Sequence, residues 1–455
     1  MDILRALRVT PQTRLAFVGA GGKTTALFQL AHEIKPKVFV CASTHLGRDQ
    51  LSLADHHYFY NRPGQYYVPN FQDLTGVILF TGPLVENGER TSGLTYDILL
   101  EIKSMADELN IPLLIEADGS RRLPIKAPAE HEPDIPAWVD SVVVVVGLSG
   151  LGKPLNSEWV HRPEIFSKLT GLQIENQIQV QHIYNMLIHP LGGLKNIPVG
   201  ARKIVLFNQA DNVILQASVM TIIPELEKIY NAEVIASLQT SPPGIAETPG
   251  SNAPIYAVYE PVAGIILAAG GAHRYGDAKL LLPWRGKPLI RHVAENAIRA
   301  GVSTLVVVLG SMINPIQEAL AGLAVEFIIN ADWAQGQSTS IKKGLNAIPN
   351  HYGAAIFLLG DQPQIPSSLL SSLIESHRHS LAPITAPLVN GTRSNPVIFD
   401  RSTFPNLLEL QGDTGGRAIF SKYQLEWVNW NDDRILLDVD TPEDYQRLLD
   451  FDKYA

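Results

Sequence analysis

Two loops in this chain combine glycines with cations in a pattern that is typical of phosphate binding. The first is GAGGKTT, residues 19–25, and the second is LAAGGAHRYGDAKLLLP, residues 267–283. Glycine lets the backbone approach a phosphate closely and turn successive N–H groups towards it. Arg adds a planar fork of donors and Lys adds a compact charge. Both loops are therefore predicted to bind the phosphates of a nucleotide.

The first loop departs from the full Walker pattern G-x-x-x-x-G-K-[ST]. Phe17 stands where the pattern needs its first glycine, so a shortened phosphate loop is expected. The lysine would meet phosphate and the following threonine would ligate Mg²⁺. The alternative is a glycine turn that binds nothing. The residues expected at the nucleotide are Gly19, Gly21, Gly22, Lys23, Thr24 and Thr25.

Polar residues at two further strand ends are candidate partners of this loop. PLLIEAD ends in Glu116 and Asp118, which are plausible carboxylates for Mg²⁺ or water. LFNQAD loosely resembles the guanine-reading pattern Asn-Lys-x-Asp through Asn208 and Asp211, with Gln209 in place of the lysine. A strand end followed by an Asn/Asp turn explains this segment equally well. The nucleotide expected here is thus ATP or GTP.

The second loop fits neither the Walker pattern nor the dinucleotide fingerprint G-x-G-x-x-G. Arg274 and Lys279 are expected to neutralise the phosphates there. The alternative is a plain turn between a strand and a helix, with incidental surface cations. The backbone expected to cradle the phosphates is that of Leu267, Ala268, Ala269, Gly270, Gly271 and Gly276.

Carboxylates follow two later apolar runs. Asp361 ends AAIFLLGD, where a ligand for Mg²⁺ is expected because this hard cation prefers oxygen and shares its sphere with substrate phosphates. Asp438 and Asp440 alternate with Val439, so in an extended segment both acids point to one face. Asp440 is a second candidate metal ligand. The alternative is a turn or capping residue before the helix that TPED starts.

These loops must be positioned by strands that alternate with helices. Apolar, β-branched runs such as KVFVCAS, SVVVVVGL and TLVVVLG are separated by helical patterns, which predicts an α/β fold. Each of two domains should be a mainly parallel sheet flanked by helices, P-loop-like in the first and Rossmann-like in the second. A Pro-, Gly- and Ser-rich break predicts domains at 1–240 and 262–455 with a linker at 241–261.

Composition excludes several classes of protein. The net charge of −9 and the lack of a Lys/Arg block argue against a nucleic-acid partner. The run VVVVVGL is too short to cross a bilayer, so no membrane association is expected. Cys41 is the single cysteine, which leaves no intrachain disulfide and fits a cytoplasmic location.

The second half resembles the MobA-like nucleotidyltransferases, and more closely the molybdenum cofactor cytidylyltransferases. LAAGGAHRYGDAKLLLP, GDQP and DVDTPED carry this resemblance in order, across about residues 262–450. It implies nucleotide contacts by Asn330, Ser338 and Ser340. It implies an acceptor side formed by Asn395, Pro396, Asp413 and Arg417. Ala272 replaces the family's Ser and Asn395 its His, whereas Ala269 favours CTP over GTP.

The implied reaction transfers CMP from CTP to the molybdopterin-type molybdenum cofactor and releases pyrophosphate. Arg274, Lys279 and Asp361 would be the catalytic residues, with Mg²⁺ on Asp361 and Asp440. Two alternatives remain open. One is a nucleotidyltransferase that acts on a sugar or alditol phosphate, and the other is a non-catalytic carrier or insertion chaperone for the molybdenum cofactor.

The first half resembles the YqeC-type accessory proteins of selenium-dependent hydroxylases. GAGGKTT, EADGSRRLPIKAPAEHEP, GLSGLGKPL with HRPE, and FNQAD carry this resemblance across about residues 8–240. It implies service to molybdenum hydroxylases, so an apo-hydroxylase is an expected partner. The activity expected of this half is binding, and as one option hydrolysis, of a purine nucleotide. A role of selenium is left open.

Overall fold

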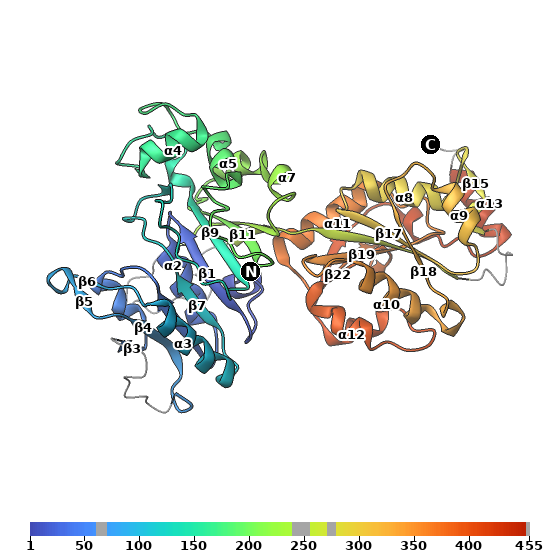
Figure 1. Ribbon diagram of the computed structural model, residues 1–455. Coiled ribbons are helices and arrows are strands. Elements are labelled where there is room, and N and C mark those ends of the chain that lie inside the picture. Colours follow the sequence, from blue (N-terminus) through green and yellow to red (C-terminus); the bar gives the residue numbers. More distant parts are fainter. Residues whose placement is uncertain (61–70, 239–254, 271–278, 452–455) are drawn as a thin grey trace. The chain divides into compact units, whose positions relative to one another are not determined.

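The chain forms two compact units, Met1–Tyr259 and Glu260–Ala455, in the computed structural model. The structure describes residues 1–60, 71–238, 255–270 and 279–451. Each unit is built on a large, mainly parallel sheet with helices packed against it (Figure 1). The predicted α/β fold class is therefore confirmed.

The first unit contains a nine-stranded sheet in the order β13-β12-β11-β9-β1-β7-β2-β4-β3. Every neighbouring pair is parallel except β12 and β13. The strands are β1 (Arg14–Gly19), β2 (Lys37–Ala42), β3 (His56–Phe59), β4 (Gly76–Thr81), β7 (Leu113–Glu116), β9 (Ser141–Gly147), β11 (Arg202–Asn208), β12 (Ala232–Ala236) and β13 (Ile255–Tyr259).

Helices cover this sheet, and short strands and 3₁₀ helices lie in the loops that connect its strands. The helices are α1 (Ile3–Ala6), α2 (Lys23–Glu33), α3 (Tyr96–Leu109), α4 (Pro163–Thr170), α5 (Val180–Ile188), α6 (Val213–Met220) and α7 (Ile223–Leu226). The short elements are the 3₁₀ helices η1 (Arg48–Leu53), η2 (Glu86–Gly88) and η3 (Leu148–Gly150), the hairpin of β5 (Leu84–Val85) and β6 (Arg90–Thr91), and the pair β8 (Ile125–Lys126) and β10 (Val160–His161).

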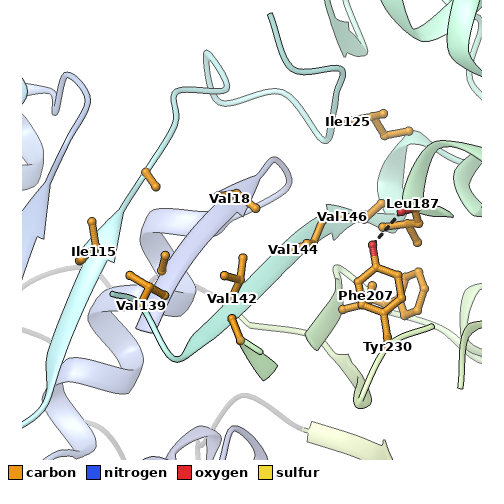
Figure 2. Packing of buried hydrophobic residues seen from close by; sticks show 14 of the residues in the cluster. Val18, Ile115, Ile125, Val139, Val142, Val144, Val146, Leu187, Phe207 and Tyr230 are labelled. Atoms are coloured by element: carbon orange, nitrogen blue, oxygen red, sulfur yellow. Dashed lines mark hydrogen bonds between the residues drawn. The ribbon is translucent and has the colours of Figure 1, made fainter. Parts of the chain in front are cut away.

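The centre of the first sheet is apolar on both faces, as expected for a parallel sheet covered by helices. Strand β9 has the sequence SVVVVVG, and six of its seven residues are buried. Figure 2 shows Val142, Val144 and Val146 of this strand in one cluster with Phe207 of β11 and Tyr230. The Tyr230 hydroxyl donates to the carbonyl oxygen of Leu187 at 2.8 Å, which satisfies its polar group inside the cluster.

The predicted linker at 241–261 is wrong for its last part. Residues 255–259 form β13, which pairs antiparallel with β12 in the register Val234↔Val258. Its sequence IYAVY is almost wholly buried, so the apolar side chains complete the edge of the first sheet. The Pro- and Gly-rich residues before it hid this strand in the sequence. Residues 239–254 lie outside the described part of the chain.

The second unit has a sheet in the order β18-β17-β14-β19-β22-β20-β21, with β23 also paired to β20. The strands are β14 (Val262–Ala268), β17 (Thr304–Leu309), β18 (Glu326–Ile329), β19 (Ala354–Leu359), β20 (Ile384–Val389), β21 (Thr392–Arg393), β22 (Val397–Asp400) and β23 (Leu425–Asn429). A separate hairpin joins β15 (Pro283–Trp284) to β16 (Lys287–Pro288). Because β14 and β19 are parallel neighbours, the loops that follow Ala268 and Leu359 leave the sheet at one edge.

Helices lie on both faces of the second sheet. One apolar cluster packs α8 (Leu289–Arg299), α9 (Ile313–Ala319) and α11 (Ser367–Ser380) against it. The other packs α10 (Gln337–Ala347) and α12 (Phe404–Leu408). The remaining elements are α13 (Pro442–Asp450) and the 3₁₀ helices η4 (Lys279–Leu281), η5 (Trp333–Gln335), η6 (Arg401–Thr403), η7 (Gly416–Lys422) and η8 (Asp433–Leu436).

Within the described ranges, no helix is both long enough and apolar enough to cross a membrane.

Candidate functional sites

Lys279 joins two carboxylates at the carboxyl edge of the second sheet. Its Nζ lies 2.6 Å from Asp361 Oδ2 and 3.0 Å from Asp440 Oδ1. Asp361 follows β19, and Asp440 directly precedes the capping residue Thr441 of α13. Burial disfavours the charged form of the lysine, but the two carboxylates outweigh that effect and raise the pKa of Lys279. Three residues that the sequence proposed for one site are thus brought together.

The same carboxylates suit a divalent cation. The described part of the chain contains no group of three or more His, Cys, Asp or Glu side chains placed to hold a metal. Mg²⁺, however, is commonly held by one or two carboxylates together with substrate phosphates. The hard oxygen donors of Asp361 and Asp440, which already share one ammonium group, fit this mode of binding.

Asp438 is a third acid at this edge. Partial burial raises its pKa, and the charges of Asp361 and Asp440 raise it further. Gln362 donates a hydrogen bond to Asp438, and this bond and the charge of Arg417 act in the opposite direction. The sequence placed Asp438 on the same face as Asp440 but gave it no role.

A pocket of about 330 Å³ lies beside these acids in the second unit. It has a largely apolar wall and a polar part formed by Gln337, Asn395, Arg417 and Asp438. Two residues expected on the acceptor side therefore line one pocket, and Pro396 is buried next to them. The apolar wall consists of Leu267, Ile341, Phe357, Val397, Phe399 and Leu407.

The side chains of Asn330, Ser338 and Ser340 are buried and bonded within the protein. The Asn330 amide donates to Thr339 Oγ1 at 2.8 Å and to Ser340 Oγ at 3.0 Å. Ser338 Oγ donates to the carbonyl oxygen of Gly412 at 2.8 Å. These bonds fix the start of α10. Direct contact of the three residues with a nucleotide stays a prediction.

The start of α10 also packs tightly against the segment that carries Asp413. Gly336 has φ +116°, and a Cβ there would lie 2.3 Å from the Gly412 carbonyl carbon. The Asp413 carboxylate accepts a hydrogen bond from the Gln337 N–H at 3.3 Å. Asp413 therefore helps to hold the helix start, and its role towards an acceptor stays a prediction.

Part of the second glycine loop can be placed and part cannot. Ala268 and Ala269 are buried at the end of β14, and Gly270 is exposed just beyond them. Gly271, Arg274 and Gly276 lie outside the described residues.

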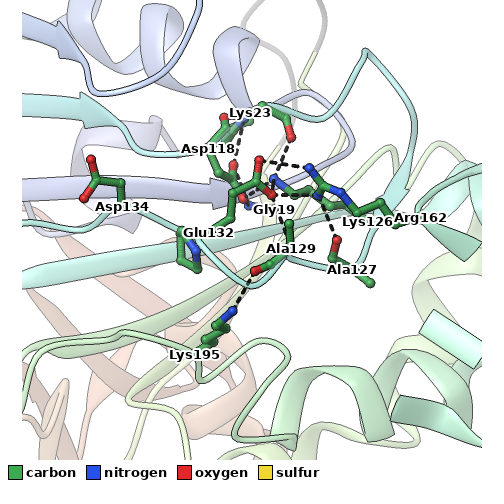
Figure 3. Close-up of polar contacts among 12 residues, drawn as sticks. Gly19, Lys23, Asp118, Lys126, Ala127, Ala129, Glu132, Asp134, Arg162 and Lys195 are labelled. Carbon is green, nitrogen blue, oxygen red and sulfur yellow. Dashed lines mark hydrogen bonds and ion pairs between the residues drawn. The ribbon is translucent and has the colours of Figure 1, made fainter. Parts of the chain in front are cut away.

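Lys23 is the centre of the candidate site in the first unit (Figure 3). Its side chain is buried, with Nζ 3.2 Å from Glu116 Oε1 and 3.1 Å from Asp118 Oδ1. Thr24 Oγ1 donates to Glu116 Oε2 at 2.9 Å. Burial opposes the charge of the lysine, but the two acids prevail and raise the pKa of Lys23. Four residues predicted for one site are therefore in contact.

The first glycine loop is held by hydrogen bonds and by close packing against neighbouring segments. The N–H of Gly19 donates to Asp118 Oδ2 at 3.0 Å, and that of Gly21 to the Leu123 carbonyl at 3.0 Å. Gly21 has φ +85°, and a Cβ there would lie 2.1 Å from the nitrogen of Gly147, so only glycine fits. Helix α2 begins next, and its first-turn N–H groups, including those of Thr24 and Thr25, point away from the helix body. They form a ready site for an anion.

Asn208 supports this loop from the end of β11. Its amide nitrogen donates to the Gly21 carbonyl at 2.8 Å, and its amide oxygen accepts from the Leu238 N–H at 2.8 Å. Asp211 accepts a hydrogen bond from Ser237. The side chains of Asn208 and Asp211 therefore form hydrogen bonds within the protein. Recognition of a guanine base by these residues stays a prediction.

Three charged residues without a predicted role extend the Lys23 cluster (Figure 3). Lys126 Nζ lies 2.8 Å from Asp118 Oδ2 and 2.8 Å from Glu132 Oε2. Arg162 binds both carboxylate oxygens of Glu132, at 2.6 and 3.1 Å. Burial alone would raise the pKa of Glu132, but the bonds from Arg162 and Lys126 lower it to about 2. The signal in the sequence was the run of charges in PIKAPAEHEP and HRPE, which follows no known spacing rule.

A cleft of about 1210 Å³ opens in the first unit beside Thr24 and Glu116. Its lining also includes Arg121, Arg122, His161 and Arg162 and consists mainly of polar and charged groups. The volume is large enough for more than a phosphate group.

Comparison with known protein families gives a match to each unit. A model of the MobA-like NTP transferase domain matches residues 264–427. A model of the YqeC protein matches residues 15–164.

Individual relatives match one unit each. The uncharacterized protein YqeC of Escherichia coli (strain K12) is 33% identical over 46% of this chain and 81% of its own length. The molybdenum cofactor cytidylyltransferase of the same organism is 28% identical over 40% of this chain and 92% of its own length. The nicotine blue oxidoreductase of Paenarthrobacter nicotinovorans is 28% identical over 41% of this chain and 96% of its own length.

Proposed function

Because the chain belongs to the YqeC family and joins to it a MobA-like NTP transferase domain, we propose that its second unit is a molybdenum cofactor cytidylyltransferase. It would transfer CMP from CTP to the molybdopterin-bound molybdenum cofactor and release pyrophosphate. The observation that carries this proposal is the contact of Lys279 with both Asp361 and Asp440. Similarity to a cytidylyltransferase supports the choice of reaction.

Charge neutralisation is the task that these residues suit. Nucleotidyl transfer needs in-line positioning of the reacting groups and compensation of the triphosphate charge. Lys279 supplies a fixed positive charge at the edge of the sheet. Mg²⁺ held by Asp361 and Asp440 would supply further charge compensation. Arg274 is proposed to bind phosphate, although it lies outside the described residues.

The neighbouring pocket suits a ring-containing acceptor with charged substituents. Its apolar wall can pack against a ring system, and Arg417 and Asn395 offer hydrogen-bond donors for a phosphate or carbonyl group. Asp438 lines this pocket and is close enough to Asp361 for the charge of that residue to raise its pKa. We propose Asp438 as an additional residue at the junction of nucleotide and acceptor.

The test is an assay of the full chain with Mg²⁺, CTP or GTP, and purified molybdenum cofactor. Pyrophosphate and the cytosine dinucleotide should both form with CTP. A nucleotidyltransferase for sugar or alditol phosphates would release pyrophosphate only with those acceptors. A carrier or insertion chaperone would bind the cofactor without releasing pyrophosphate. A relative of similar identity is named an oxidoreductase, so sequence similarity alone does not identify the reaction. The product of the assay identifies it.

For the first unit we propose binding of ATP or GTP on the glycine loop. The buried Lys23, the Thr24–Glu116 hydrogen bond and the free start of α2 support this role. Glu116 and Thr24 would hold Mg²⁺, and NTP hydrolysis is the activity to assay. We further propose that this unit assists maturation or delivery of the cofactor to an apo molybdenum hydroxylase in the cytoplasm.

A further inference from the structure

The cleft of the first unit extends well beyond the glycine loop. One end is formed by Thr24 and Glu116, where the phosphates of a nucleotide are proposed to lie. The rest of the lining, the cleft wall, comes from η1, residues 87–90, the segment 119–123 and the start of α4. The segment 119–123 contacts the glycine loop, where the Leu123 carbonyl accepts the Gly21 N–H. Such a cleft has room for a second ligand next to a bound nucleotide.

The segments of the cleft wall are connected to one another. Gly47 forms a bridge with Arg90, and the Arg48 N–H donates to the Glu89 carbonyl at 2.9 Å. Arg122 forms an ion pair with Asp49 at 2.5 Å, which ties the segment 119–123 to η1. Backbone contacts therefore join η1 to residues 89–90, and a side-chain ion pair links the segment 119–123 to η1.

The acids of the cleft that lie nearest the glycine loop are paired with cations. Asp49 is paired with Arg122, Glu116 with Lys23, and Glu132 with Lys126 and Arg162. Arg48 and Arg121 are exposed, and the structure records no ion pair or side-chain hydrogen bond for them among the residues it describes. Glu89 and Glu164 are exposed acids on the rim of the cleft. Within the described part of the chain, Arg48 and Arg121 therefore have no side-chain partner that would compete with an anion.

Three arginines that line the cleft have a left-handed backbone conformation. Arg121 and Arg122 have φ of +51° and +61°, and Arg162 has φ +70°. Residues other than Gly, Asn and Asp rarely adopt this backbone conformation. Residues that are strained in this way cluster at binding sites. All three of these arginines line the cleft.

His161 lines the cleft close to several positive charges. Loss of hydration lowers its pKa to about 4, together with the charges of Arg162, Lys126 and Arg121. Glu132 acts in the opposite direction but does not compensate. An anion bound here would relieve this repulsion.

We propose that the cleft binds the phosphate group of an organic phosphate monoester, as a second ligand of the first unit beside the nucleotide. Arg48 and Arg121 would bind the phosphate dianion, because guanidinium groups recognise phosphate through paired hydrogen bonds. The inference deepens the proposed role of the first unit and rests on it only for the position of the nucleotide.

Site-resolved protection of arginines tests the proposal on the full chain. Phenylglyoxal modifies accessible arginines, and peptide mass spectrometry reads out each position. Glycerol 3-phosphate at millimolar concentration should slow modification of Arg48 and Arg121 at least about threefold. Arg299 and Arg447 are exposed arginines of the second unit and serve as internal controls that should not change.

Three parallel samples give the outcomes that would overturn the proposal. Equal protection by potassium chloride of the same ionic strength would mean simple screening. Equal protection by glycerate would contradict the assignment to phosphate, and protection by inorganic phosphate alone would contradict an organic ligand. No protection in any sample would remove the site.

Calorimetry with variants gives a second readout. Arg121→Ala and Arg48→Ala should each weaken binding of glycerol 3-phosphate about tenfold or more, whereas the matched variant Arg299→Ala should bind as the wild type does. Unchanged affinity in the first two variants would overturn the proposal. Binding of a fluorescent ATP or GTP analogue to the wild-type chain is measured separately. Its failure alone would refute the proposed nucleotide role and leave the anion site standing.

Discussion

Lys279 and Asp361 are separated by 82 residues in the sequence, and their side-chain atoms lie 2.6 Å apart. Lys279 belongs to η4, in the last part of the segment 267–283, and Asp361 follows the parallel strand next to β14. The contact depends on the order of strands in the sheet, because that order brings both loops to one edge. It is the structural basis for proposing nucleotidyl transfer.

Replacing Asp361 by Asn should reduce nucleotidyl transfer on the order of 100-fold, since it removes a negative oxygen donor and keeps the shape of the side chain. The rate of pyrophosphate release with CTP and cofactor measures this. Circular dichroism and thermal unfolding should show an intact fold. Asp433→Asn, an exposed acid of η8, is the matched control and should keep its activity. Near-normal turnover of Asp361→Asn would remove this residue from the mechanism.

Replacing Lys23 by Ala should abolish binding of a nucleotide analogue to the first unit and should also reduce stability. Glu116 and Asp118 would each lose a buried cationic partner. Breaking a buried ion pair costs about 3–5 kcal/mol. Urea unfolding followed by fluorescence gives the free energy of unfolding, and fluorescence anisotropy gives nucleotide affinity. Lys228→Ala, which breaks an exposed pair with Glu225, should change both by little. A Lys23→Ala protein that is stable and binds nucleotide would contradict our account.

Glu132 should make the first unit acid-sensitive. Its folded pKa of about 2 lies below the ordinary value of 4.5, so its ion pairs stabilise the fold above about pH 4.5. This contribution, on the order of 2 kcal/mol, is lost as the pH falls from 4.5 towards 2. Glu132→Gln should therefore lower stability at pH 7 and flatten the dependence of stability on pH in that window. Unfolding curves between pH 2 and 7 measure both effects, and an unchanged acid limb would refute the role of Glu132.

Gly336→Ala should destabilise the second unit more than Gly322→Ala does. Both glycines have positive φ, +116° and +81°, so an alanine is strained at either position. At Gly336 the added Cβ would also meet the Gly412 backbone at 2.3 Å, whereas no atom lies within 4 Å at Gly322. We expect a loss of about 1 kcal/mol for Gly322→Ala and at least about twice that for Gly336→Ala. Thermal unfolding of the two variants compares them, and equal losses would show that the contact is not tight.

Much of the fold and part of each site could be predicted from local sequence. Short apolar runs separated by helical patterns determine the parallel sheets, and residues that end strands of one sheet must share an edge. This reasoning predicts that Lys23 lies near Glu116 and that Lys279 lies near Asp361. The structure contains both contacts.

The remainder depends on packing between distant segments. The bonds of Lys126 and Arg162 to Glu132 join residues from separate loops that no spacing rule connects. The sequence predicts a linker where β13 forms, because the five residues of this strand follow a Pro- and Gly-rich stretch. Asn330 carries polar groups that suit a ligand, but the fold uses them to fasten α10. Local sequence does not reveal which of these partners a polar side chain will choose.

The most direct test of the central proposal is the product formed by the full chain from CTP, Mg²⁺ and purified molybdenum cofactor. We predict stoichiometric release of pyrophosphate and formation of the cytosine dinucleotide, identified by mass spectrometry. The rates of both should fall on the order of 100-fold in Asp361→Asn. Cofactor binding without pyrophosphate, or pyrophosphate release only with sugar or alditol phosphates, would contradict the assignment.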